Sequence, residues 1–262
     1  MEFIYLATAF IIGAAIGSFI HVIVLRYNTG LSFIQGNSVC LSCSVPLSWY
    51  HLIPIFSYLA LKGRCSHCYS HFSIQYFLAE LISGITFVWL FLFSNFSLFQ
   101  SFLLSLIFFI LLFIFIYDLR HKIIPDPSVY LFIVISFLYA YITNLCLPDP
   151  VIQAGIFPFF LAAFIIPFPF FLIWFFSKGR MMGLGDVKFM VGMGALLGLS
   201  SGVSAIFLSF WIGATYVLLA FVYKKLFKKG YNMGMKTELP FAPFLIIATL
   251  LVFIFKINLV NF

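Results

Sequence analysis

The sequence predicts an all-α polytopic membrane protein, with about eight transmembrane helices and a small polar insert between the first and the second. Hydrophobic residues make up 64% of the 262 residues and charged residues 8%, which is outside the range of soluble domains. Apolar runs of spanning length recur along the chain, and residues 26–73 form the only long polar stretch. The net charge of +7 would suit a nucleic-acid partner in a soluble chain. Here the basic residues lie between the apolar runs, where they act as topology signals, so we expect no nucleic-acid partner.

Eight apolar segments are expected to cross the membrane. The first, about Phe3–Leu25, has a charge-poor start and lacks a small-residue cleavage site, which argues against a cleaved signal peptide. The others are expected at about Ile74–Phe93, Leu98–Tyr117, Ser128–Cys146, Ile152–Phe176, Val187–Leu199, Val203–Tyr223 and Pro240–Leu259. We therefore divide the chain into a first helix (1–25), an insert that contains two cysteine pairs (26–73) and a seven-helix core (74–262).

Small residues and prolines predict how some of these helices pack. Gly13 and Gly17 have the G-x-x-x-G spacing that lets another helix approach closely. Glycines recur every four residues through the sixth segment and past its end, at Gly194, Gly198 and Gly202. We expect this glycine-lined side of the helix to pack against the third segment. Prolines in the fifth segment predict a kinked helix. These prolines are Pro158, Pro167 and Pro169.

The basic residues predict the orientation in the membrane. If the N-terminus is outside, all but one of the fourteen Lys and Arg residues lie on the cytoplasmic side, and only Lys256 lies towards the far side. The polar insert is then cytoplasmic. The end of the third apolar segment and the start of the sixth also share the cytoplasmic face.

Two of the seven acidic residues stand at that face. Asp118 ends the third apolar segment in Y-D-L-R-H-K-I-I-P-D, and Asp186 precedes the sixth in G-L-G-D-V-K. A charge at this depth is costly unless it is paired or functional. Two close carboxyl groups share one proton, so one can act as a base on water while the other polarises a carbonyl. The pair predicts a catalytic aspartyl dyad, and Gly183 and Gly185 would let a substrate backbone approach it.

The other polar residues in or beside the apolar segments are expected to have structural roles. Asp126 lies between two prolines before the fourth segment and is expected to cap a helix. Glu80 lies about two turns into the second segment and needs a partner or a water-filled cavity. His21 is expected to form a hydrogen bond between helices. Asp149 is expected in an exterior loop, and the Lys224–Lys229 cluster is expected to anchor the chain at the inner face and to attract anionic lipid.

Four of the five cysteines form two C-x-x-C pairs in the insert. Cys40 and Cys43 are separated from Cys65 and Cys68 by 21 residues, and four thiolates at this spacing can close a tetrahedral zinc site. Two disulfides or free thiols are the alternatives, and disulfides are disfavoured because cytoplasmic thiols stay reduced. The fifth cysteine, Cys146, is expected to be a lone apolar thiol.

In these motifs the chain resembles the type IV prepilin peptidases, bacterial membrane aspartyl proteases that remove the basic leader from prepilins and pseudopilins. The resemblance extends over nearly the whole chain. Besides the cysteine and acid motifs it includes G-S-F-I-H-V-I-V-L-R (Gly17–Arg26), L-S-W-Y-H-L-I-P-I-F-S-Y-L (Leu47–Leu59) and K-T-E-L-P-F-A-P-F (Lys236–Phe244). It implies that Asp118 and Asp186 are the catalytic pair and that the four paired cysteines bind the metal.

The resemblance also implies a second activity and a location. Many members of that family methylate the newly exposed N-terminus with S-adenosylmethionine. His21 and His51 stand where asparagine is common, and Ala242 where glycine is common, departures that bear chiefly on the methyltransferase inference. The implied location is the bacterial cytoplasmic (inner) membrane, with the active site at the cytoplasmic face. The implied substrates serve type IV pili, protein secretion or DNA uptake, and membrane lipid surrounds the protein.

Two other classes of protein remain open at this stage. A presenilin-like intramembrane aspartyl protease also carries a Y-D and a G-x-G-D motif, but its acids lie deep within spans, whereas these border basic loops. A non-enzymatic cation transporter with a zinc-stabilised loop would use its acids to bind cations. That class gives no reason for the G-x-G that precedes Asp186.

Overall fold

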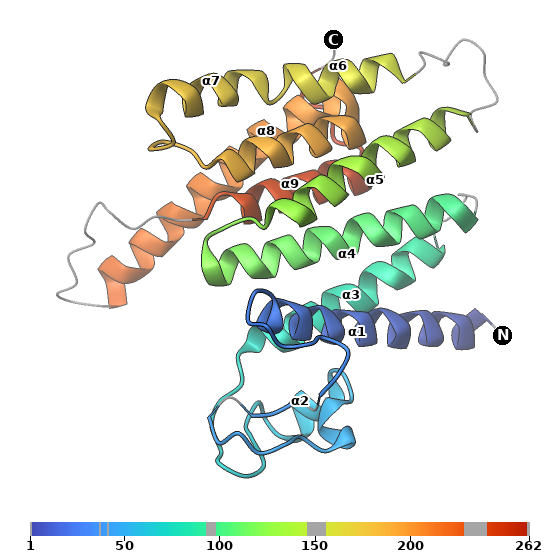
Figure 1. Ribbon diagram of the computed structural model, residues 1–262, viewed down its shortest axis with the longest axis vertical. Coiled ribbons are helices and arrows are strands. Elements are labelled where there is room, and N and C mark those ends of the chain that lie inside the picture. Colours follow the sequence, from blue (N-terminus) through green and yellow to red (C-terminus); the bar gives the residue numbers. More distant parts are fainter. Residues whose placement is uncertain are drawn as a thin grey trace. The chain divides into compact units, whose positions relative to one another are not determined.

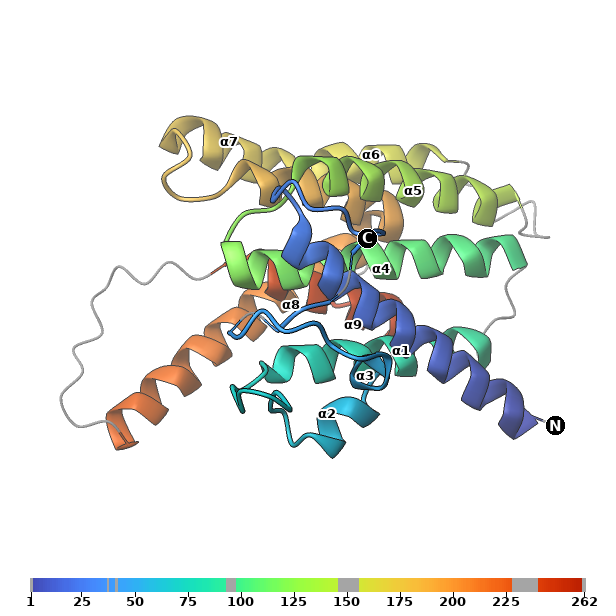
Figure 2. The same cartoon turned by 60° about the horizontal axis from the view of Figure 1, so that its bottom comes forward.

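The computed structural model describes residues 2–36, 38–40, 42–92, 98–145, 156–227 and 240–260. These residues are helical apart from loops and two isolated β-bridges, which confirms the all-α class (Figure 1). They form two compact units, Met1–Ile116 and Tyr117–Phe262 (Figures 1 and 2). Cys146, Asp149 and the side chains of the Lys224–Lys229 cluster lie outside the described part of the chain.

The first unit contains the polar insert and the helices on either side of it. Its elements are α1 (Glu2–Arg26), the 3-10 helix η1 (Trp49–Leu52), α2 (Phe56–Ala60), α3 (Ile74–Leu92) and most of α4 (Leu98–His121). The glycines of α1 lie against α3, where a Cβ atom on Gly13 would stand 2.6 Å from the carbonyl oxygen of Ser83. A Cβ atom on Gly17 would stand equally close to the Ser83 hydroxyl. The predicted close approach of another helix to Gly13 and Gly17 is thus confirmed.

Two buried polar side chains of this unit have the partners that the sequence required. The Nε2 atom of His21 lies 3.1 Å from the carbonyl oxygen of Gln75 in α3, so this nitrogen donates the hydrogen bond. The His21 ring also stacks on Tyr76. The carboxylate of Glu80 accepts a hydrogen bond from the backbone N–H of Ile55 at 2.7 Å. Both residues therefore link separate segments, as expected for polar groups in an apolar protein.

The second unit contains the last turn of α4 and the remaining helices. These are α5 (Asp126–Leu145), α6 (Phe157–Ile165), α7 (Phe168–Ser177), α8 (Leu184–Phe227) and α9 (Ala242–Phe255), and α8 packs on α5, α6 and α9. The break between α6 and α7 falls at Ile166 and Pro167, which confirms the predicted kink. Pro158 and Pro169 lie instead in the first turns of their helices, where the missing N–H has no consequence.

The chain reverses direction inside α8, at Gly198. This residue has φ 76° and ψ −175°, a left-handed conformation that favours glycine. A Cβ atom on Gly202 would lie 4.0 Å from the Cα atom of Gly194, although eight residues of straight helix span about 12 Å. The two arms of α8 thus correspond to the predicted sixth and seventh segments.

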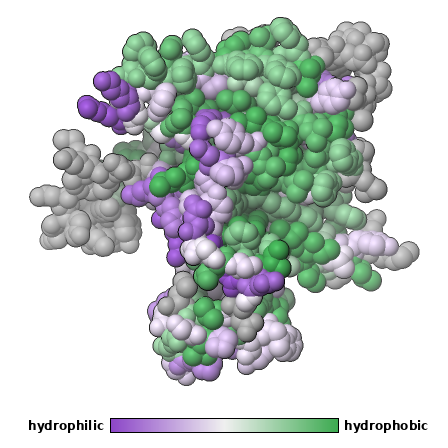
Figure 3. Space-filling view, in the orientation of Figure 1, coloured by the Kyte–Doolittle hydropathy of each residue, from purple (hydrophilic) through white to green (hydrophobic). Residues whose placement is uncertain are grey.

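The membrane-spanning character of the fold follows from helix length and surface. Among the described residues, six helices are long and apolar enough to cross a membrane, with α6–α7 and α8 each counted once, and α9 is a shorter apolar helix. When α8 is divided at Gly198, each of the eight predicted segments has a helix. Hydrophobic residues cover most of the visible surface of these helices, and hydrophilic ones gather where α4 ends and α8 begins (Figure 3).

The expected neighbour of the glycines in α8 is wrong. These residues face α6 and not the third segment, which is α4. A Cβ atom on Gly194 would stand 2.7 Å from the carbonyl oxygen of Ala162, and one on Gly202 would overlap the end of the Ile166 side chain. Because Ala162 and Ala163 are also small, the backbones of α6 and α8 can approach closely here.

Candidate active site

Asp118 lies in the last turn of α4. This helix ends at His121, about one turn beyond the predicted end of the third segment, so Asp118 is part of the helix. Its side chain is 4% exposed, and its Oδ2 atom is buried without a hydrogen-bond partner among the described residues. The backbone N–H of Lys122 donates to the Asp118 carbonyl at 2.8 Å, and Lys122 has φ 56°, so the chain turns away directly after the acid. A buried carboxyl group with a free oxygen is suited to contact a substrate or water.

Asp186 lies in the first turn of α8, where a negative charge interacts favourably with the N-terminal end of a helix. The two glycines before Asp186 differ in their surroundings. A Cβ atom on Gly183 would make only an ordinary contact, 3.4 Å from Asp186 Oδ2, whereas one on Gly185 would lie 3.0 Å from the Cβ atom of Ile124. Gly185 is therefore closed off by the α4–α5 loop, and only Gly183 retains the predicted space for a substrate backbone.

The second unit brings the two acids together. Asp118 and Asp186 are close enough for their carboxyl groups to interact electrostatically. Asp118 comes from the end of α4 and Asp186 from the start of α8, and the α4–α5 loop, through Ile124, packs against the G-L-G-D turn. The arrangement places two electrostatically coupled carboxyl groups at the ends of helices and not in the middle of a span.

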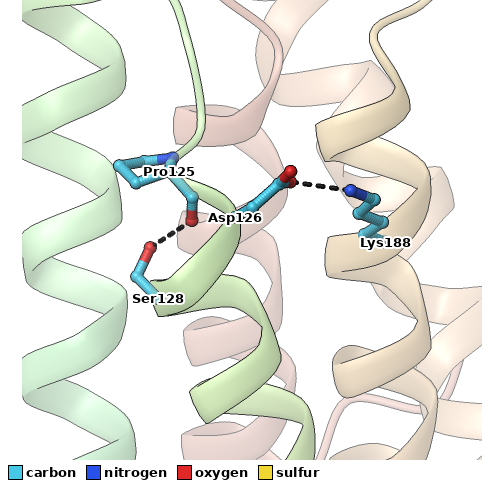
Figure 4. A network of polar contacts seen from close by, with 4 residues as sticks. All are labelled: Pro125, Asp126, Ser128 and Lys188. Atoms are coloured by element: carbon cyan, nitrogen blue, oxygen red, sulfur yellow. Dashed lines mark hydrogen bonds and ion pairs between the residues drawn. The ribbon is translucent and has the colours of Figure 1, made fainter.

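A third acid, Asp126, forms an ion pair with a lysine near the start of α8 but does not belong to the aspartyl dyad. The Nζ atom of Lys188 lies 2.7 Å from Asp126 Oδ1, and Figure 4 shows this ion pair between the beginnings of α5 and α8. Lys188 also lies over the ring of Tyr130, 5.1 Å from its centre. Beside it, the Ser128 hydroxyl donates to the Pro125 carbonyl at 2.7 Å (Figure 4). Asp126 is the first residue of α5, one position after the place of a cap residue, and its carboxylate forms an ion pair that the sequence did not predict.

The four cysteines of the insert come from two turns of the same design. In each C-x-x-C pair, the N–H of the first cysteine donates to the carbonyl five residues later, at 3.0 Å and 2.9 Å. The N–H four residues later donates back to that cysteine, at 2.8 Å and 3.1 Å. The residues after the second cysteines, Ser44 and Tyr69, both have positive φ, 58° and 55°. The repeated turn points both sulfur atoms of each pair to one side, as in a zinc knuckle.

The sulfur atoms form a compact cluster that can hold a metal ion. The four Sγ atoms lie within 4.8 Å of one another, and those of Cys40 and Cys68 are 3.8 Å apart. A tetrahedral zinc site with Zn–S bonds of about 2.3 Å has sulfur–sulfur edges of about 3.8 Å. The cysteines are free, so the alternative of two disulfides is wrong. The backbone N–H groups of Cys43 and Ser42 lower the pKa of the Cys40 thiol to about 6, which favours the thiolate that a metal requires.

The fold and the two sites define a multi-pass helical membrane protein that carries a coupled pair of acids and a four-cysteine cluster. Residues 11–94 match the family model of the bacterial peptidase A24 N-terminal domain, and residues 105–218 match that of the type IV leader peptidase family. The chain belongs to the type IV leader peptidase family, as its resemblance to the prepilin peptidases implied.

Three relatives illustrate how far the similarity extends, and each is named prepilin leader peptidase/N-methyltransferase. The protein from Vibrio cholerae is 31% identical over 210 residues, which cover 76% of this chain and 79% of the relative. That from Bacillus subtilis is 28% identical over 257 residues, 98% of this chain and 97% of the relative. That from Xanthomonas campestris is 32% identical over 226 residues, 82% of this chain and 71% of the relative. No solved structure shows a significant match to the chain.

Proposed function

We propose that this protein is an aspartyl endopeptidase of the bacterial inner membrane. In this proposal it cleaves the basic leader from type IV prepilins or pseudopilins and N-methylates the new N-terminus. The observation that carries the proposal is that the loop after Asp118, through Ile124, packs on the G-L-G-D turn of Asp186, so that the end of α4 and the start of α8 are neighbours. Membership of a peptidase family and the names of the relatives support the choice of reaction and substrate.

Asp118 and Asp186 supply a balanced hydrolytic mechanism. One carboxylate removes a proton from a water molecule, and the oxygen of that water attacks the carbonyl carbon of the scissile peptide. The other acid, which is protonated, donates a hydrogen bond to the carbonyl oxygen as negative charge develops there. When the tetrahedral intermediate collapses, the C–N bond breaks and the leaving nitrogen takes up a proton from the dyad. The unpartnered Oδ2 atom of Asp118 and the open side of Gly183 leave places for water and substrate.

The position of the acids suits a substrate with a polar leader and an apolar helix. Asp118 lies one turn from the end of α4, and Asp186 lies in the first turn of α8. If the basic residues orient the chain as the sequence predicts, both acids lie at the cytoplasmic face. The apolar helix of the prepilin would then stay in the bilayer while the leader peptide bond reaches the dyad. A presenilin-like site deep within the spans is disfavoured by these helix-end positions.

The insert would bind one structural zinc ion through Cys40, Cys43, Cys65 and Cys68. The ion would cross-link the two cysteine turns and so stabilise the insert. S-adenosylmethionine would supply the methyl group for the second activity.

Replacement of the dyad acids tests the proposal. We expect Asp118→Asn and Asp186→Asn each to abolish cleavage of a prepilin in proteoliposomes, as measured by mass spectrometry of the product N-terminus. The matched control is Asp126→Asn, which removes an acid of the same region and its ion pair with Lys188 but leaves both dyad acids in place, and we expect it to lose no more than about fivefold in activity. Near-normal cleavage by either dyad variant would show that the assignment of catalytic residues is wrong.

A further inference from the structure

The insert presents an unusual number of large apolar side chains to its surroundings. Within the described part of the chain, Trp49 is 78% exposed, Phe56 70% and Leu59 59%. Tyr50, Leu52 and Ile53 are also exposed, so the apolar surface runs from η1 through α2. So many large apolar side chains within eleven residues would be unfavourable in contact with water, so they mark a surface that is covered by a partner.

The position of α2 beside α3 indicates the depth at which this surface lies. The backbone N–H of Ile55 donates to the Glu80 carboxylate at 2.7 Å. The ring of Tyr58 lies against Phe77, with 5.4 Å between ring centres. Phe77 and Glu80 come three and six residues after the first residue of α3, Ile74, which corresponds to about 5 Å and 9 Å along the helix. The segment therefore lies alongside a membrane-crossing helix and not beyond its end, as both views in Figures 1 and 2 show.

The contacts that hold α2 in this place are specific. Glu80 is buried, so its hydrogen bond with the Ile55 N–H is shielded from water. Tyr58 is held on its other side by Gly63, where a Cβ atom would lie 2.8 Å from the phenol ring. Gly63 has φ 66°, so its backbone conformation and the space it leaves both favour glycine.

The exposed face of α3 indicates what surrounds the protein at that depth. Ile74, Leu78, Ile82 and Ile85 follow one another at helical spacing, and all four are exposed. Such an apolar stripe on a spanning helix faces the acyl chains of the bilayer. A segment that lies beside the first two turns of the same helix reaches the region between the lipid headgroups and the acyl chains. Tryptophan and tyrosine side chains are enriched in this region of membrane proteins.

We propose that residues 49–59 are a membrane-interface anchor for the insert, with the lipid bilayer as the partner that covers the apolar surface. Trp49, Phe56 and Leu59 enter the boundary between headgroups and acyl chains. Lys62, an exposed residue directly after α2, reaches the lipid phosphates. The anchor holds the two cysteine turns against the membrane surface, although η1 and α2 are each too short to span it.

Fluorescence of Trp49 tests this directly. In a full-length variant with Trp89, Trp174 and Trp211 each replaced by Phe, Trp49 is the only tryptophan. The protein is reconstituted into vesicles of phosphatidylcholine and phosphatidylglycerol that carry bromine either near the glycerol or near the chain end. We expect blue-shifted emission and stronger quenching by the shallow bromines. Emission typical of water without quenching would overturn the proposal.

A matched probe separates the anchor from the rest of the insert. In the same background, Trp49→Phe with Tyr69→Trp places the tryptophan on the second cysteine turn, at an exposed position five residues before α3 begins. We expect water-like emission and little quenching there. Equal shallow quenching at both positions would contradict an anchor confined to residues 49–59. Shielding of Trp49 that requires an added prepilin would also contradict it and would assign the surface to a protein partner.

A polar variant tests whether the apolar side chains are the cause. In the Trp49-only protein, Phe56→Asp with Leu59→Asp should shift the emission towards that of water and remove the shallow quenching. Helical circular dichroism and the reactivity of the four cysteines of the insert report whether the variant is folded. Unchanged quenching in a folded variant would overturn the proposal.

Discussion

Lys188 stands two residues after Asp186, and its ammonium group is held between the Asp126 carboxylate and the face of Tyr130. The Lys188 side chain is 22% exposed and that of Asp126 58%, so solvent screens the ion pair. Its contribution to global stability is then at most about 1 kcal/mol. The pair nevertheless links the first residue of α5 to the second turn of α8, directly after the turn that carries a proposed catalytic acid.

This geometry leads to a prediction for Lys188→Met. The variant should lose peptidase activity by on the order of fivefold, through a lower kcat, while its thermal unfolding changes little. The charge exchange Asp126→Lys with Lys188→Asp should recover part of the loss, because it restores an ion pair between the same helices. Kinetics of prepilin cleavage and thermal unfolding of the same preparations give the answer. No recovery in the exchanged protein would indicate that Lys188 acts by another route.

The two glycines of the G-L-G-D turn should respond differently to an added methyl group. Gly185→Ala places a Cβ atom 3.0 Å from the Cβ atom of Ile124, closer than most real contacts, and overpacking of this kind costs about 1–3 kcal/mol. Gly183→Ala makes only a 3.4 Å contact with Asp186 Oδ2. We expect Gly185→Ala to lower the unfolding temperature and Gly183→Ala to leave it unchanged. Equal unfolding temperatures for the two variants would contradict the packing of the turn on Ile124.

At the scale of the elements, apolar runs and proline positions predicted most helices, because a membrane-spanning helix must be long and apolar. The break at Pro167 and the helices on both sides of Gly198 were predictable for this reason. The helix that packs on the α8 glycines could not be predicted, because a G-x-x-x-G pattern indicates that some helix approaches closely but does not identify which helix. Asp118 and Asp186 were identified as rare acids beside apolar runs. The Asp126–Lys188 ion pair was not identified from the sequence, because a lysine near the end of a membrane span is also expected from topology alone.

The cysteine turns lead to a prediction about metal content. The purified protein should contain about one zinc ion per chain, bound by four thiolates. Replacing Cys65 and Cys68 together by Ser should remove the zinc and expose the insert to faster proteolysis between Arg26 and Ser73. Cys146→Ser is the matched control, because this cysteine belongs to neither turn, and it should keep the metal. A metal-free native protein with intact thiols would refute the zinc assignment.

At the scale of the whole molecule, the two chemical features occupy different compact units. The cysteine cluster lies in Met1–Ile116, whereas Asp118 and Asp186 lie in Tyr117–Phe262. The two family models divide the chain in a similar place, at residues 11–94 and 105–218. In the proposed function, peptide hydrolysis belongs to Asp118 and Asp186 of the second unit. The insert of the first unit, residues 26–73, is the only long polar stretch of the sequence. It is therefore the segment best suited to form a site for methyl transfer.

This division predicts that methyl transfer and proteolysis can be separated. Asp186→Asn should lose cleavage but still methylate a peptide that already has the mature N-terminus. Arg64 is exposed between the cysteine pairs, and its guanidinium group can hold an anionic group of the methyl donor, so Arg64→Ala should impair methylation more than cleavage. Gly63→Ala is not a clean test, because a Cβ atom there would displace Tyr58 and disturb the insert as a whole.

Mass spectrometry of the mature peptide measures both reactions at once, with S-adenosylmethionine supplied. Lys256→Ala is the control, because it removes an exposed basic residue of the second unit that is remote in sequence from both acids. It should leave both reactions unchanged. Loss of methylation in Asp186→Asn in parallel with cleavage would show that the two reactions share a site. If the unaltered protein also yields a product that is cleaved but never methylated, peptide cleavage is the sole activity. Arg64 then has no role in binding a methyl donor.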